Sequence, residues 1–288
     1  MIRKAVIPAA GAGTRLLPAT KAQPKEMLPI LDTPAIQYVV QEAVDAGIGE
    51  ILLVTGRGKR AVEDHFDRNL ELESHLARRG EDHALEAVRR LGELARIHYV
   101  RQPIQAGLGD AIGCARAFVG DEPFAVLLGD TIMDAPVPVT RQLMDVYEEH
   151  HTPVLAVEDV RPEQIRRYGI VEGVSLGPRQ YRIERLVEKP HPGETDSTLA
   201  IAGRYILTPD VFDALEATQP GRNDEIQLTD ALAGMLGKTS MVAVSIEGRR
   251  FDIGNKQDYL RTVLAHALKR EEFSEVIEEV LPAAKGDR

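Results

Sequence analysis

The sequence predicts an α/β protein with a doubly wound, mostly parallel sheet that becomes mixed in its second half. In the first half, short segments that are apolar throughout alternate with helical segments. Strands of this kind are buried on both faces and are typical of a parallel sheet covered by helices. In the second half, strand-like segments are separated by turns that contain Pro and Gly, and the strand–helix alternation weakens. The length of 288 residues is ample for one large core.

Four strands and the helices between them make up the expected first half. The strands are expected at residues 4–8, 51–54, 97–100 and 124–128. Apolar residues recur with helical spacing from Ile36 to Val44, and Thr33 is expected to cap this helix, with Pro34 as its first residue and Gly47 as its stop. Further helical stretches are expected at about 59–95 and 110–118.

The second half contains expected strands at residues 154–157, 183–187, 200–207 and 241–246. No repeat or linker separates it from the first half, so we expect residues 1–135 and 136–265 to be two halves of one α/β domain. Residues 266–288 form a C-terminal amphipathic helix and tail. Its expected apolar face consists of Phe273, Val276, Ile277, Val280 and Leu281. Packing against its own domain and packing against a second subunit are about equally compatible with this pattern.

Composition excludes several classes of function. The chain carries 35 Lys and Arg against 45 Asp and Glu, a net charge of −10, which argues against binding to nucleic acid or to an anionic membrane. No apolar run reaches the ~18 residues that a membrane-spanning helix needs. The single cysteine, Cys114, excludes an internal disulfide framework and a cysteine-cluster zinc site. We therefore expect a cytoplasmic protein without nucleic-acid or membrane partners.

A glycine-rich turn follows the first strand, in the segment Pro8-Ala-Ala-Gly-Ala-Gly-Thr-Arg-Leu. Gly11 and Gly13 allow a tight turn whose amide N–H groups can approach an anion. The dinucleotide fingerprint is absent because Leu16 stands where its third glycine is required. No Gly-Lys-Ser/Thr follows, so the turn is not a Walker loop, and Asp32 precedes the second strand, which excludes a Rossmann dehydrogenase.

The segment after this turn is basic and rich in proline. We expect Pro18, Pro24 and Pro29 to keep it out of helix and to make it a stiff, extended loop. Its cations are Arg15, Lys21 and Lys25. Beside the glycine turn, they favour binding of a triphosphate over a basic loop that is merely solvated.

From this loop onward the chain resembles the sugar-nucleotide pyrophosphorylases, the nucleotidyltransferases that act on sugar 1-phosphates. Within them it is most similar to the bacterial uridylyltransferases of glucose 1-phosphate. The motifs that carry the resemblance occur in order from Ala5 to about Leu264. They are Asp64-His-Phe-Asp, Leu70-Glu-Leu-Glu, Arg101-Gln, Ala106-Gly-Leu-Gly, Val126-Leu-Leu-Gly-Asp, Tyr168-Gly-Ile-Val, Glu188-Lys-Pro, Ala202-Gly-Arg-Tyr and Glu225-Ile-Gln-Leu-Thr-Asp. One position departs from the family, because Asp110 stands where a histidine is usual.

The resemblance implies a nucleotide-diphospho-sugar transferase fold and a reaction. The reaction would be Mg²⁺-dependent transfer of a uridylyl group from UTP to glucose 1-phosphate by direct in-line attack, giving UDP-glucose and pyrophosphate. Residues 1–135 would bind the nucleotide and residues 136–265 the sugar phosphate. Relatives that are oligomers also favour a homodimer or homotetramer, held in part by the C-terminal helix.

The resemblance also implies the residues of the site. The nucleotide would be bound by Ala10, Gly11, Gly13, Thr14, Arg15, Lys25, Gln102, Gly107 and Asp130. The sugar phosphate would be bound by Gly169, Glu188 and Lys189, and Mg²⁺ by Asp130 and Asp252. Arg15, Lys25 and Lys189 would be the catalytic cations.

Other readings stay open at this point. Asp130 is also compatible with a turn cap, and Asp252 with an Asx-turn into Gly254. The same motifs suit a thymidylyl- or other nucleotidyltransferase that acts on a different sugar 1-phosphate. A non-catalytic regulator that binds a sugar nucleotide is a further alternative.

Overall fold

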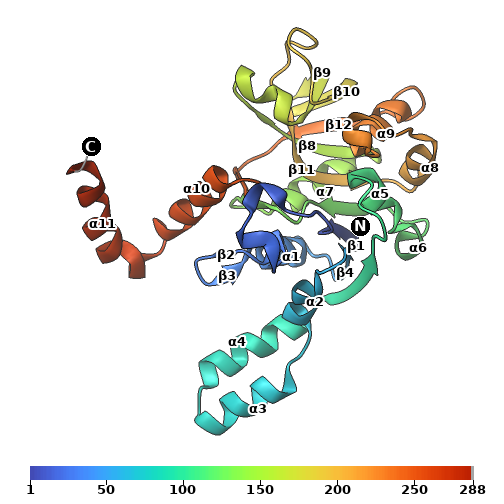
Figure 1. Ribbon diagram of the computed structural model, residues 1–288. Coiled ribbons are helices and arrows are strands. Elements are labelled where there is room, and N and C mark those ends of the chain that lie inside the picture. The colour runs from blue at the N-terminus through green and yellow to red at the C-terminus, as the bar shows by residue number, and fades with distance from the viewer. Residues whose placement is uncertain (287–288) are drawn as a thin grey trace.

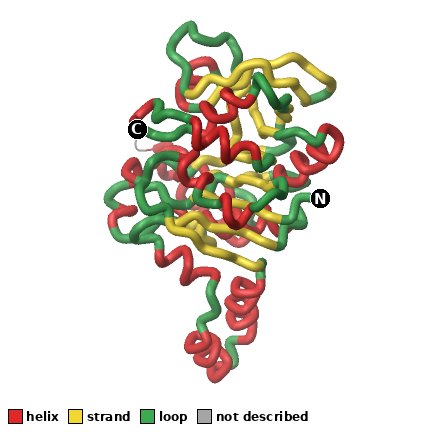
Figure 2. The backbone as a smooth tube through the Cα atoms, turned by 90° about the vertical axis from the view of Figure 1, so that its right-hand side faces the viewer, coloured by secondary structure: helices red, strands yellow, loops and turns green. Residues whose placement is uncertain are grey.

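The computed structural model describes residues 1–286, with Arg222 and residues 281–286 described by their backbone alone. A nine-stranded sheet runs through the molecule in the order β5-β4-β1-β6-β11-β8-β12-β10-β9. Helices lie on both sides of it (Figures 1 and 2). This confirms the predicted α/β fold with a mixed central sheet.

The parallel part of the sheet consists of the four strands expected from the first half. β1 (Lys4–Pro8) lies between β4 (Glu50–Thr55) and β6 (Phe124–Leu127) and is parallel to both, and β5 (Arg96–Arg101) adds to β4 in parallel. Every residue of β6 is buried, as its continuous apolar sequence predicts.

The second half makes the sheet mixed. β11 (Leu199–Leu207) pairs antiparallel with both β6 and β8 (Val154–Asp159), and β12 (Val242–Ser245) adds to β8 in parallel. β10 (Gln180–Glu188) and β9 (Gly169–Gly177) complete the sheet in antiparallel order. β9 was not predicted, because glycines interrupt its sequence and its second half is exposed.

Two apolar layers cover the sheet. On one face, α1 (Ala35–Asp45) and α7 (Val139–His150) pack on alternate residues of the parallel strands. On the other face lie α5 (Leu108–Gly113), α8 (Asp210–Ala217) and α9 (Leu228–Met235). Val126 of β6 faces the second layer, whereas its neighbours Ala125 and Leu127 face the first.

The helical stretch expected at 59–95 is three helices and not one. They are α2 (Arg60–Phe66), α3 (Leu70–Arg79) and α4 (Asp82–Glu93), and α3 and α4 project from the body (Figure 1). The Asn69 side chain caps α3 by accepting from the amide of Leu72, and Gly80 ends it with a φ of 70°. The helix expected at 110–118 is likewise divided into α5 and α6 (Arg116–Val119).

Two local predictions near the N-terminus are wrong. The proline-rich segment is not extended but folds into three short 3-10 turns at Thr14–Leu16, Ala19–Lys21 and Lys25–Met27. Thr33 does not cap α1, because Thr33–Pro34 forms strand β3, which pairs with β2 (Pro29–Ile30).

A small ribbon and the C-terminal helices complete the chain. β7 (Thr131–Asp134) pairs antiparallel with β13 (Arg249–Asp252), and α10 (Lys256–Ala267) follows. α11 (Ser274–Gly286) extends away from the sheet (Figure 1). Within residues 1–286 no helix has the length and apolar character required to cross a membrane.

The apolar stripe expected on the C-terminal helix is only partly covered among the described residues. Val276 and Val280 are 57% and 58% exposed, and Phe273 and Ile277 are partly buried. The side chain of Leu281, the fifth predicted member, lies outside the described residues. Exposed leucines of the preceding segment extend the apolar surface; they are Leu260, Leu264 and Leu268.

Candidate active site

One cavity of about 680 Å³ lies at the carboxyl ends of β1 and β6. Parallel strands present their carboxyl ends at the same edge, where ligands bind in open α/β sheets. Every site residue that the family resemblance implied lines this cavity: Ala10, Gly11, Gly13, Thr14, Arg15, Lys25, Gln102, Gly107, Asp130, Gly169, Glu188, Lys189 and Asp252. Lys21, which was expected to share in binding a triphosphate, does not line it.

The glycine turn brings a cation to the cavity floor. Gly13 adopts a φ of 67°, as the tight turn requires, and the chain then folds back so that Lys25 reaches Asp130. The Lys25 Nζ atom lies 2.6 Å from Asp130 Oδ2. Burial alone would lower the pKa of Lys25, but the nearby Asp130 and Glu26 carboxylates outweigh it and raise the pKa. Lys25 is therefore a permanent positive charge beside a carboxylate.

Asp130 and Asp252 meet through the β7–β13 ribbon. Asp252 is paired in register with Thr131, the residue after Asp130. Burial would raise the pKa of Asp130, but Lys25 and then Arg15 lower it. Burial and the Asp130 charge raise the pKa of Asp252. The Oδ1 atom of Asp252 also accepts from the Gly254 amide at 2.6 Å, so the Asx-turn that the sequence allowed is present as well.

These two carboxylates fit Mg²⁺ that is shared with a nucleotide. Among the described residues no group of three or more His, Cys, Asp or Glu side chains is arranged to hold a metal ion. Mg²⁺ in phosphate-transfer sites is typically bound by one or two carboxylates together with substrate phosphates. Two neighbouring acids repel each other when both are ionised, and a cation between them removes that repulsion.

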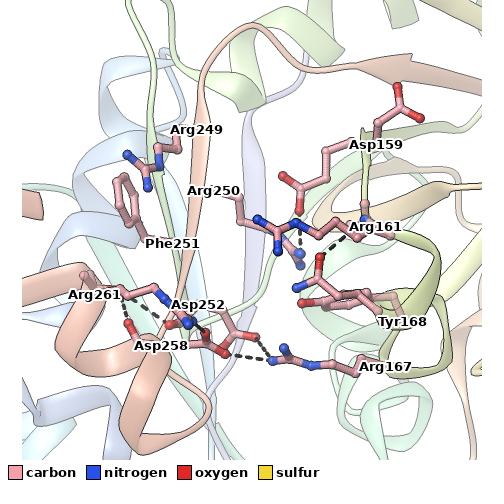
Figure 3. Close-up of a pocket in the computed structure, with 14 residues that line it drawn as sticks. Asp159, Arg161, Arg167, Tyr168, Arg249, Arg250, Phe251, Asp252, Asp258 and Arg261 are labelled. Atoms are coloured by element: carbon pink, nitrogen blue, oxygen red, sulfur yellow. Dashed lines mark hydrogen bonds and ion pairs between the residues drawn. The ribbon is translucent and has the colours of Figure 1, made fainter.

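A second, smaller pocket of about 310 Å³ lies on the far side of Asp252 (Figure 3). Arg167 lines this pocket and points toward two of its acids, with its guanidinium 2.7 Å from Asp258 and 4.0 Å from Asp252. Arg250 stacks on the Tyr168 ring with its guanidinium carbon 4.4 Å from the ring centroid, and it pairs with Glu158 at 2.5 Å. These contacts fix the wall from which Asp252 projects.

The turn that carries Asp130 is held by a buried arginine. Arg204 of β11 is fully buried and donates to the carbonyl oxygens of Thr131 at 2.7 Å and Leu128 at 3.5 Å. Its charge is balanced by Glu42 of α1 at 2.7 Å. Because these carbonyls flank Asp130 in the chain, Arg204 determines the path of the backbone on both sides of that residue. Sequence reasoning missed this role, although Arg204 lies in the Ala202-Gly-Arg-Tyr motif.

The base of the glycine turn rests on a buried lysine. Lys59 donates to the Gly11 carbonyl oxygen and to a Glu26 carboxylate oxygen, both at 2.7 Å. Burial lowers the pKa of Lys59 and raises the pKa of Glu26, while each charge partly offsets the other's shift. Neither residue was predicted, since a Lys at a helix start has no distinctive pattern.

Gln102 and Gly107 form a further part of the cavity lining. Gln102 follows β5, and its Nε2 atom donates to Gly107 O at 3.1 Å and to Asp110 Oδ2 at 2.6 Å. Gly107 has a φ of 109°, and a Cβ there would lie 2.6 Å from the Ile226 carbonyl oxygen. The glycine is therefore required by the neighbouring chain, in addition to any approach of a ligand.

Glu188, the last residue of strand β10, and Lys189, which follows it, also line the cavity. Glu188 accepts from the Thr229 hydroxyl at 2.8 Å and lies 2.6 Å from the Lys189 ammonium. Lys189 has a φ of 45°, which is unusual for a residue with a side chain and is often found at functional sites. A Cβ on Gly169 would lie 2.8 Å from the Thr229 hydroxyl oxygen, so packing inside the protein accounts for this glycine.

Comparisons with known proteins bear on this site. Residues 4–268 match the family described as nucleotidyl transferase. The chain is 50% identical over 272 residues to a UTP–glucose-1-phosphate uridylyltransferase of Bacillus subtilis strain 168, covering 94% of this chain and 93% of the relative.

Solved structures agree with that result. A UDP-glucose pyrophosphorylase complexed with UDP-glucose is 42% identical with a TM-score of 0.87, covering 94% of this chain and 100% of that one. A UTP-bound UGPase from Acinetobacter baumannii is 38% identical with a TM-score of 0.90, covering 97% and 100%. The chain therefore belongs to the nucleotidyl transferase family, which confirms the resemblance to the uridylyltransferases of glucose 1-phosphate and makes the protein a nucleotidyltransferase.

Proposed function

We propose that this chain transfers a uridylyl group from UTP to glucose 1-phosphate with the help of Mg²⁺, releasing pyrophosphate. The observation that carries the proposal is the meeting of two charge groups in one cavity. Lys25 forms one ion pair there with Asp130, near which Asp252 also lines the cavity, and Lys189 forms a second ion pair with Glu188. Two substrates that each carry phosphate match these two charge groups, one group for the nucleotide and one for the sugar phosphate.

Residues 1–135 supply the nucleotide side of the proposed site. The backbone of the turn from Ala10 to Thr14 surrounds the phosphates, and Arg15 and Lys25 neutralise charge on the departing pyrophosphate. Gln102 and Gly107 face the base. When bound between Asp130 and Asp252, Mg²⁺ supplies positive charge to the phosphate oxygens.

Residues 136–265 supply the sugar-phosphate side. The Glu188 carboxylate accepts hydrogen bonds from sugar hydroxyls, with Gly169 beside it, and Lys189 orients the attacking phosphate. A sugar phosphate, with a second pKa near ~6, is mostly dianionic at neutral pH. Its oxygen needs no base to remove a proton before it attacks the α-phosphorus of UTP in line. Catalysis then rests on positioning and charge neutralisation.

A pyrophosphate-release assay tests this proposal. With UTP, glucose 1-phosphate and Mg²⁺, release is expected to exceed that with CTP, ATP, GTP or dTTP and with other sugar 1-phosphates. Preference for dTTP would replace the proposal by a thymidylyltransferase. No release with any pair would favour a regulator that binds sugar nucleotides, against which the retained Arg15, Lys25 and Lys189 argue.

We also propose a homodimer or homotetramer, supported by the apolar stripe that α11 leaves exposed at Val276 and Val280. A large exposed apolar stripe is typical of a surface that a second subunit covers. The proposed compartment is the cytoplasm, in keeping with the single Cys114.

A further inference from the structure

The side-chain amide of Gln102 is held in one orientation. Its Nε2 atom donates to Asp110 Oδ2 at 2.6 Å and to the Gly107 carbonyl oxygen at 3.1 Å. A carbonyl oxygen and an ionised carboxylate can only accept hydrogen bonds. Turning the amide over would bring Oε1 against both of these oxygens, so the chemistry of the two partners selects the orientation.

This orientation decides what Gln102 offers to a ligand. An amide nitrogen carries two hydrogens, and both are used by Asp110 and Gly107. Gln102 lines the cavity, and the polar side-chain atom that these two bonds leave is the acceptor Oε1. Gln102 is 4% exposed, so water competes little for this acceptor.

We propose that Asp110 determines base specificity by acting through Gln102. With the amide held by Asp110, Oε1 accepts from the N3–H group of uracil. Cytosine has an acceptor at N3, and two acceptors facing each other are left without a hydrogen bond in a buried place. Asp110 is then a positioning residue for a discrimination between UTP and CTP. The inference rests on the proposed function, because it places the base beside Gln102.

Asp110→Asn is the sharpest test, because it keeps the size of the side chain but adds a donor. The introduced amide is able to accept from Nε2 of Gln102 or to donate to Oε1, so only the Gly107 carbonyl oxygen still selects the orientation of Gln102. The ratio of kcat/KM for UTP to that for CTP should fall by roughly tenfold. The KM for glucose 1-phosphate should stay unchanged. Asp110→Ser, which also both donates and accepts, should lower the ratio in the same direction.

Asp121→Asn is the matched control, because Asp121 is exposed and does not line the cavity. It should leave the ratio at the wild-type value. Calorimetric titration with UTP and with CTP, without sugar phosphate, should show the same loss of preference in Asp110→Asn as the kinetics do.

Gln102→Ala separates failure of this inference from failure of the proposed site. If Gln102→Ala lowers the UTP-to-CTP ratio and Asp110→Asn keeps the wild-type ratio, Asp110 does not act through Gln102 and the inference is overturned alone. If Gln102→Ala itself keeps the wild-type ratio, the base is not read by Gln102, and both the base assignment and this inference fall.

Discussion

Lys59 and Glu26 form an ion pair of 2.7 Å with side chains only 6% and 1% exposed, directly beneath the glycine turn. Lys59 also holds the Gly11 carbonyl oxygen. One buried pair thus joins the start of α2, the segment before β2 and the turn proposed to bind phosphates. A pair in this position is costly to break, because the remaining charge stays buried without a partner.

Lys59→Met should therefore lower the free energy of unfolding by about 3–5 kcal/mol. Replacing both partners, in Lys59→Met with Glu26→Leu, should restore most of that stability, since no isolated charge remains. Urea unfolding measures both. Lys238→Met, on the exposed surface, is the matched control and should change stability by less than about 0.5 kcal/mol. A Lys59→Met variant as stable as this control would show that the pair contributes nothing.

Asp130→Asn should reduce kcat by about a hundredfold or more at any Mg²⁺ concentration. The substitution removes one of the two carboxylate charges proposed to bind the cation and also the partner of Lys25. Steady-state kinetics over a Mg²⁺ titration measure the effect. Asp134→Asn, at the far end of the same strand β7, is the control. Wild-type turnover in Asp130→Asn would refute the metal assignment.

Lys189→Ala and Lys25→Ala should damage different substrates. Lys189 follows β10 and pairs with Glu188, whereas Lys25 pairs with Asp130. We expect Lys189→Ala to raise the KM for glucose 1-phosphate by about ten- to a hundredfold, and Lys25→Ala to raise the KM for UTP similarly. Two-substrate kinetics separate the effects. Equal effects on both substrates in both variants would contradict the division.

Asp258 should stabilise the fold in a pH-dependent way. Burial would raise its pKa, but hydrogen bonds from Arg167 and Asn255 lower it below the usual 3.8. An acid with a lowered folded-state pKa stabilises the protein above its unfolded pKa, and this is lost as pH falls through the folded value. Asp258→Asn should thus be less stable by about 1–2 kcal/mol near neutral pH. Denaturant unfolding at a series of pH values should show the gap closing below about pH 4. A gap that stays constant down to acid pH would argue against the ion pairs.

Removal of the residues after Lys269 should lower the oligomeric mass. The truncation deletes the apolar stripe of Phe273, Val276, Ile277 and Val280, of which the two valines are exposed, and leaves the residues that line the cavity in place. Light scattering on the full chain and on the truncated chain measures the change. Paired substitutions Val276→Glu and Val280→Glu should have the same effect without shortening the chain. An unchanged mass would mean that another surface holds the subunits together.

The sequence by itself determined the strands of the parallel half, the glycine turn, and part of the residues that line the cavity. These elements are readable because burial on both faces demands continuous apolar residues, and a tight turn beside a ligand demands glycine. The family motifs identified Asp130, Glu188 and Lys189 although these residues lie far apart in the chain. The C-terminal stripe was visible as a pattern, but the exposure of Val276 and Val280 was not.

Tertiary structure alone decided how these residues are supported. The pairing of β7 with β13 sets Asp252 beside Asp130, and neither strand is distinctive in sequence. The partners of Arg204 lie 162 residues away at Glu42 and 73 residues away at Thr131, and no local periodicity records such a contact. Likewise, only folding brings Asp110 against Gln102 and so fixes which atom of the amide remains for a ligand. The local sequence pattern predicts burial and backbone conformation. Hydrogen bonds between distant segments form only when folding brings those segments together.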